Sequence, residues 1–124
     1  MMAKDKFEEL KVFSEAHKLA LLIYKFTKNF PKSEIYGLTS QIRRSSVSVA
    51  ANIVEGNSRG HKKEFLQFLY LANGSLEETK YHLLLAKDLG YLNEKEYNLA
   101  HSQAEIVGKL LTGLMNYCKK IINS

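Results

Sequence analysis

Apolar residues in this chain recur at steps of three and four, the spacing of one buried helix face. Four such stretches follow one another, over about residues 7–28, 38–56, 61–89 and 94–121. The linkers between them are short, so consecutive helices should be antiparallel neighbours. The pattern predicts an all-α protein, an antiparallel up-and-down four-helix bundle that forms a single domain over residues 1–124.

Turn residues mark the expected helix ends. Pro31 cannot continue the hydrogen bonds of the first helix, and Thr39 is expected to cap the start of the second. Gly90 is placed to adopt the left-handed conformation that ends the third helix. Asn93 and Glu96, three residues apart, resemble a capping box at the start of the fourth.

The third and fourth helices carry the most regular apolar seams, and we expect both seams to be buried. The seam of the third helix consists of Phe65, Leu69, Ala72, Leu76, Thr79, Leu83 and Ala86. The seam of the fourth consists of Tyr97, Ala100, Ala104, Val107, Leu111, Leu114, Cys118 and Ile121.

The third helix also carries more apolar surface than a bundle needs. Residues 65–72 are apolar almost all the way round the helix, although a bundle helix needs only about three apolar residues in seven. Large exposed apolar patches are uncommon on monomers. We therefore expect self-association through four residues of this helix, Phe68, Tyr70, Leu71 and Leu84. The alternative is a tightly wrapped bundle in which these side chains lie half-buried at its edges.

One polar stripe runs along the second helix, whose other residues are mostly small or β-branched. Arg44, Ser48, Asn52 and Glu55 are spaced by four, four and three residues, so they share one helix face. A buried arginine and a buried glutamate are costly unless they are paired. The interpretation we favour is a polar network that sets the register between helices or subunits. The alternative is a pocket or a ring lumen that binds a ligand.

The formal net charge of +5 is unevenly distributed along the chain. Residues 1–62 hold eleven Lys and Arg against six Asp and Glu, whereas residues 63–124 hold seven against seven. Lys11, Lys18 and Lys25 form a lysine row at steps of seven residues, about 10 Å apart along the first helix.

Further basic residues add to the positive charge of the lysine row. Lys28 and Lys32 follow the lysine row, and a basic turn precedes the third helix, with Arg59, Lys62 and Lys63. Such residues can bind the phosphate backbone of RNA or DNA without reading its sequence. The alternative for the row is an ordinary solvated helix face.

The residues that could carry catalysis or hold a metal are few. None of the four histidines, His17, His61, His82 and His101, follows a glutamate by three residues, as in the metal sites of other bundles. Cys118 is the only cysteine, so it forms no intrachain disulfide, and its seam position suits a small apolar residue. We expect no metal, no cofactor and no catalytic residue, and hence a protein that is not an enzyme.

The sequence also predicts where the protein is located, because it shows neither a signal peptide nor a membrane span. Residues 1–6 are charged and do not resemble a signal peptide, and no apolar run approaches the length of a membrane span. A single cysteine suits a reducing compartment. The sequence therefore predicts a cytoplasmic protein without a membrane partner.

Several blocks of the sequence resemble the bacterial four-helix bundle proteins called 23S rRNA-intervening-sequence proteins. The order and spacing of the blocks agree over nearly the whole chain. One departure is Phe13, where that family has an aromatic residue that is often tryptophan. The blocks are residues 7–13 (FEELKVF), 30–31 (FP), 34–44 (EIYGLTSQIRR), 52–56 (NIVEG) and 74–78 (GSLEE), with Ser48, Arg59, Glu64 and Phe65.

The resemblance implies a ring-like homopentamer with no established catalytic residue. A related branch, the accessory proteins of diversity-generating retroelements, forms basic pentameric barrels that bind nucleic acid and a reverse transcriptase. The resemblance therefore implies RNA or DNA, and a reverse transcriptase or another protein, as partners. Its matching motif residues Arg43, Arg44, Asn52, Glu55 and Gly56 overlap the polar stripe.

Two functions follow. The leading hypothesis is a non-enzymatic homo-oligomer that binds RNA or DNA through its basic surface. The alternative is a protein-interaction adaptor or scaffold with no nucleic-acid role.

Overall fold

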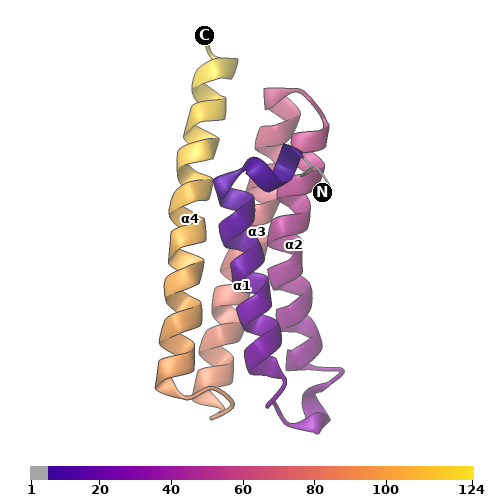
Figure 1. Ribbon diagram of the computed structural model, residues 1–124, viewed down its shortest axis with the longest axis vertical. Coiled ribbons are helices and arrows are strands. Elements are labelled where there is room, and N and C mark those ends of the chain that lie inside the picture. The colour runs from indigo at the N-terminus through magenta and orange to yellow at the C-terminus, as the bar shows by residue number, and fades with distance from the viewer. Residues whose placement is uncertain (1–5) are drawn as a thin grey trace, which may run out of the picture.

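The computed structural model describes residues 6–124, which form four long antiparallel helices (Figure 1). Helix α1 spans Lys11–Thr27, α2 spans Leu38–Ser58, α3 spans Lys62–Asp88 and α4 spans Glu94–Ile122. Each helix packs against the next, and α1 packs against α4. The predicted all-α, up-and-down four-helix bundle is confirmed.

The four helices occupy the corners of a square. Among the described residues, the backbones of α1 and α3 do not approach each other closely, and neither do those of α2 and α4, so these pairs lie on the diagonals. The start of α1, the turn between α2 and α3, and the end of α4 lie at one end of the bundle (Figure 1). The other two loops lie at the opposite end. A surface on the outer side of α3 therefore faces away from α1.

The first helix begins later than predicted. A separate 3-10 turn, η1, spans Lys6–Glu9, and Leu10 is extended (φ −76°, ψ 124°) before α1 starts. The ring of Phe7 contacts the ring of Phe13 edge-on, with 5.0 Å between centroids. Residues six apart in one helix lie on different faces, so this contact requires the break at Leu10. The expectation of one helix over 7–28 is wrong at its start for this reason.

The start of α2 is capped by a residue that sequence reasoning missed. Gly37, not Thr39, precedes the first helical residue, and the expected cap is wrong. Glu34 lies in a short 3-10 turn, η2 (Lys32–Glu34), and its Oε1 accepts a hydrogen bond from the Leu38 N–H at 3.1 Å. A Cβ at position 37 would lie 2.6 Å from that same oxygen, so this geometry favours glycine.

The turn between α3 and α4 follows its sequence signals. Gly90 has φ +80°, as predicted for the residue that ends the third helix. The Asn93 side chain accepts from the Glu96 N–H at 2.8 Å, and Glu96 Oε1 accepts from the Asn93 N–H at 3.0 Å. The predicted capping box is confirmed.

The core is a column of apolar side chains between the four helices. All seven predicted seam residues of α3 are buried. On α4 the seam turns away from its predicted course near the end, where Met115 is buried, Leu114 is half-buried and Ile121 is exposed. An α-helix has 3.6 residues per turn, so a strict heptad drifts off the buried face over a long helix.

Candidate nucleic-acid interface

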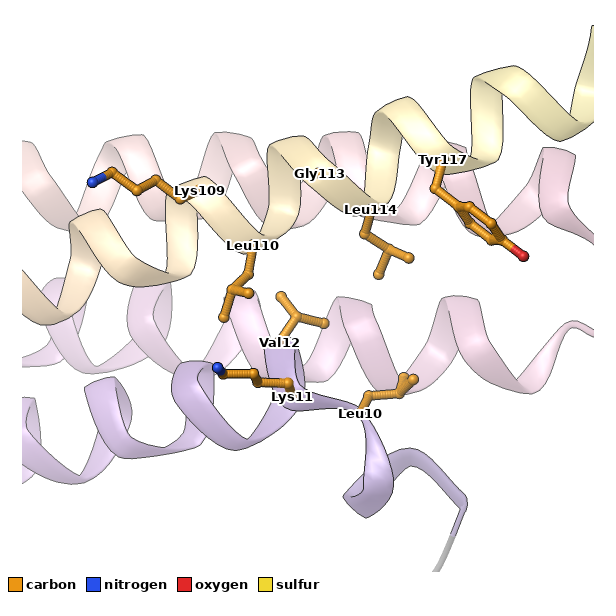
Figure 2. A pocket seen from close by; sticks show the side chains of 8 residues that line it. All are labelled: Leu10, Lys11, Val12, Lys109, Leu110, Gly113, Leu114 and Tyr117. Carbon is orange, nitrogen blue, oxygen red and sulfur yellow. The ribbon is translucent and has the colours of Figure 1, made fainter.

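The lysine row of α1 lies along the groove between α1 and α4. Lys11 borders a hollow in this groove together with Lys109 of α4 (Figure 2). Lys18 and Lys25 border a second hollow between the same helices, with Gln103 of α4. All four lysines are exposed. Sequence reasoning missed Lys109 because it lies far along the chain, and only the packing of α4 against α1 brings it to Lys11.

The charges of the lysine row are largely uncompensated. Lys18 Nζ lies 3.3 Å from Glu15 Oε2, a surface pair of a kind that contributes only about 0–1 kcal/mol. Lys11 and Lys25 form no ion pair with any carboxylate of residues 6–124. Their ammonium groups are therefore available to an anionic ligand.

The hollow at the Lys11 end has an apolar floor and a cationic rim. It has a volume of about 390 Å³, and its floor is built from Leu10, Val12, Leu110, Gly113 and Leu114. The ammonium groups of Lys11 and Lys109 point toward one end of this groove, and the ring of Tyr117 lies toward the other (Figure 2).

The other basic candidates lie at the two ends of the bundle. Lys28 follows the last residue of α1, and Lys32 begins η2. The basic turn lies at the end of the bundle opposite to Lys28 and Lys32, and Lys11 starts α1 at this same end (Figure 1). The structure therefore brings the basic turn to the same end as Lys11, and it separates this turn from Lys28 and Lys32 by the length of the bundle.

Within the basic turn, the charge of Arg59 is already engaged. Its guanidinium lies 2.7 Å from Glu55 Oε1 and 3.9 Å from Glu64 Oε2. It also lies over the ring of Phe68, 5.1 Å from the centroid. Arg59 is therefore less available to a phosphate than Lys62 or Lys63, which form no ion pair among the described residues.

The polar stripe of α2 lies beside α3 and bonds to it. Arg44 pairs with Glu78, Ser75 Oγ donates to Ser48 Oγ at 3.0 Å, and Asn52 donates to the Ser48 carbonyl at 2.9 Å. Arg44 is exposed, as is Glu55 further along the stripe, so neither charge bears the cost of burial. Contacts of this kind can set helix register, and that role of the stripe stays a prediction.

Next to the stripe lies a buried hydroxyl cluster that includes a histidine. Thr79 Oγ1 donates to Ser45 Oγ at 2.8 Å, and Ser45 Oγ lies 3.4 Å from His82 Nδ1. A serine beside a histidine is the pairing of a nucleophile and its base. Here Ser45 is fully buried and donates its own proton to the Ile42 carbonyl at 3.2 Å. A substrate therefore has no access to Ser45. The cluster instead joins α2 to α3 through the hydrogen bond between Thr79 and Ser45.

The described residues offer few other groups for chemistry. In residues 6–124, no three histidine, cysteine or acidic side chains lie close enough together to hold a metal ion. Cys118 is fully buried, and burial raises the pKa of its thiol, which disfavours the reactive thiolate. None of the helices described here has both the length and the apolar character that crossing a membrane requires.

The α3 flank, which comprises Phe68, Tyr70, Leu71 and Leu84, is largely exposed in the single chain. Leu71 is 57% exposed and Leu84 is 41% exposed, and Tyr70 is exposed as well. Phe68 differs from these three because it is half-buried: its Cβ lies against Gly56 of α2, where an added Cβ would approach it to 2.6 Å.

A second apolar surface lies between α1 and α2, and sequence reasoning missed it. This α1–α2 groove has a volume of about 480 Å³. The small residues of the second helix indicate a central, heavily covered helix, whereas Val47 and Ala51 of α2 are exposed. The groove is lined by Phe13, His17, Ala20, Leu21, Tyr24, Val47, Ala50, Ala51 and Val54.

Comparison with known proteins decides the family. Residues 8–113 match the model of the 23S rRNA-intervening sequence protein family. The chain belongs to this family. The family resemblance seen in the sequence is thereby confirmed. The match includes α1, α2, α3 and most of α4, and it ends before Leu114 and Tyr117.

A solved structure agrees with this assignment. It is the crystal structure of a protein with unknown function from the S23 ribosomal protein family of Bacteroides thetaiotaomicron VPI-5482. It is 27% identical to this chain, with a TM-score of 0.75, and the alignment covers 84% of this chain and 97% of that one. A comparison with curated proteins finds no significant match. The 23S rRNA-intervening sequence protein family is one of unknown function, with no known catalytic activity.

Proposed function

We propose that this protein is a non-enzymatic homo-oligomer that binds the phosphate backbone of RNA or DNA. The observation that carries the proposal is the exposed cationic edge formed by Lys11, Lys18 and Lys25 of α1 with Lys109 of α4. Ammonium groups along one groove neutralise phosphates and release their counterions, which drives binding without reading sequence. Lys28, Lys32 and the basic turn extend the positive surface at the two ends.

Self-association is supported by the two apolar surfaces. The α3 flank and the α1–α2 groove involve different helices, and α1 and α3 occupy diagonal corners of the bundle. Two different surfaces facing different ways suit a head-to-tail contact between copies, which closes into a ring when the rotation allows. The lysine row lines neither apolar surface, although Leu21 lines both the α1–α2 groove and the hollow beside Lys18 and Lys25. A ring of five subunits is what the family resemblance implies, and a cytoplasmic location is the expectation from the sequence.

A salt series tests the nucleic-acid function. We expect the affinity for a structured RNA, measured by fluorescence anisotropy, to fall steeply as salt rises. Replacing Lys18 and Lys25 by Gln should lower the slope of log K against log salt by roughly one for each phosphate that is no longer neutralised. Lys87→Gln is the control for loss of a positive charge outside the lysine row, because α3 lies diagonally across the bundle from α1. No binding at low salt, or a slope near zero, rejects the proposal.

A second function, a protein-interaction adaptor, is favoured by the α1–α2 groove. An apolar groove between two helices is the form of site that binds an amphipathic helix. The partner would be a reverse transcriptase or another protein, in line with the resemblance. Sedimentation separates the two functions: a strict monomer, with both apolar surfaces free, supports the adaptor, and a closed oligomer supports the first proposal.

A further inference from the structure

We infer that the hollow between Lys11 and Tyr117 seats an unpaired base, so that the preferred ligand is a single-stranded nucleic acid. This inference rests on the proposed nucleic-acid function and narrows its ligand. A lysine row alone binds duplexes and single strands alike, because both present phosphates. The hollow has two further features, an aromatic ring and an apolar floor, that an unpaired base can use and a duplex cannot.

The aromatic feature is Tyr117. Its side chain is 54% exposed and lines the same hollow as Lys11 and Lys109 (Figure 2). Aromatic rings beside positive charge form the usual platform for single strands, in which bases stack on the ring and phosphates meet the cations. Tyr117 lies beyond the residues that the family model matches, which end at 113.

The apolar feature is the floor of the hollow. Leu10 and Val12 contribute from the start of α1, and Leu110 and Leu114 contribute from α4. A duplex presents phosphates and sugars on its outside and keeps its base faces stacked inside. The face of an unpaired base, in contrast, can cover leucine and valine side chains while its phosphate reaches Lys11 or Lys109.

Gly113 keeps the hollow open. A Cβ added at this position would meet no heavy atom within 4 Å, so a side chain there has room to extend. Because Gly113 lines the hollow, a larger side chain would fill it without disturbing the core. Glycine is a poor helix former, so the replacement should also favour the helix. Gly113→Leu is therefore a variant that blocks the site and preserves the fold.

The test compares a labelled oligo(dT) with a DNA duplex of the same length, by anisotropy at one salt concentration. Wild type should bind the single strand more tightly. Gly113→Leu and Tyr117→Leu should each weaken single-strand binding roughly tenfold and leave duplex binding unchanged, and Tyr117→Phe should retain it. Tyr36→Leu is the control, because Tyr36 is 94% exposed and lies in the loop between α1 and α2, at the opposite end of the bundle.

The outcomes separate this inference from the proposed function. Equal affinity for both forms, or single-strand binding that survives Gly113→Leu and Tyr117→Leu, overturns the inference and leaves phosphate binding intact. No binding to either form rejects both. The inference is also overturned if Gly113→Leu abolishes binding of an acidic amphipathic peptide while the single strand is unaffected, because the hollow would then serve a protein.

Discussion

The Tyr91 hydroxyl donates a hydrogen bond to Glu34 Oε2 at 2.8 Å and thereby joins two loops that lie far apart in the sequence. The other carboxylate oxygen of Glu34 accepts from the Leu38 N–H. One carboxylate thus caps α2 and holds the loop between α3 and α4. The rings of Phe30 and Tyr91, 5.5 Å apart, add an apolar contact between the same loops.

Tyr91→Phe should lower the melting temperature within a limited pH range. The bonds from Leu38 and Tyr91 hold the pKa of Glu34 below 4.5, and Glu34 holds the pKa of Tyr91 above 10.0. The stabilisation is therefore present between pH 4.5 and 10.0, and it is lost as Glu34 gains a proton in acid or Tyr91 loses one in base. Thermal melts of both proteins across pH check this, and a difference that does not vary with pH contradicts it.

His82→Gln should flatten the dependence of stability on pH below neutrality. Burial lowers the pKa of His82 below 6.5, with Arg44 lowering it further and Glu78 opposing them. The unfolded chain then binds a proton more readily than the folded one, so wild type is fully stable above pH 6.5 and loses stability as the pH falls below it. Urea midpoints at about pH 7.5 and 5.5 measure the effect, with His61→Gln, at an exposed position, as the control. If the urea midpoint changes equally between these two pH values in wild type and in His82→Gln, the prediction is wrong.

Gly56→Ala should destabilise the protein because α2 and α3 touch at this residue. The added Cβ would lie 2.6 Å from the Cβ of Phe68 and 2.9 Å from Cδ1 of Phe65. Crowding of this kind costs about 1–3 kcal/mol, which exceeds the gain in helix propensity of up to about 1 kcal/mol. Gly74→Ala, where the Cβ meets nothing within 4 Å, should stabilise instead. The free energy of unfolding in urea, measured for both variants, should therefore change in opposite directions.

Leu71→Asp and Leu84→Asp should dissociate the oligomer without unfolding the helices. Both side chains are already exposed in the single chain, so a charge there does not disturb the core. In an interface between copies, the same charge would be buried without a partner, which strongly opposes association. Sedimentation velocity should show a shift to monomers, with the circular dichroism unchanged. Leu99→Asp on α4, also at an exposed leucine, should leave assembly intact, and a wild type that is monomeric at all concentrations refutes the prediction.

The sequence was sufficient for features that depend on near neighbours along the chain. The buried seam of α3, the left-handed Gly90 and the capping box of Asn93 and Glu96 were all predictable. Apolar periodicity and turn chemistry act over a few residues, so their signals survive without knowledge of the partner helix. The same reasoning placed Lys11, Lys18 and Lys25 on one exposed face of α1.

Features that join distant segments could not be predicted from the sequence and depend on how the helices pack. The hydrogen bond of Tyr91 to Glu34, the position of Lys109 beside Lys11, and the exposed Arg44 all depend on which helices are neighbours and how each is rotated. The break at Leu10 has the same origin, because the contact of Phe7 with Phe13 requires the chain to turn there. The apolar periodicity of a helix shows which of its faces is buried, but it does not show which neighbouring helix covers that face. The groove between α1 and α4 exists only once those partners have been set by packing.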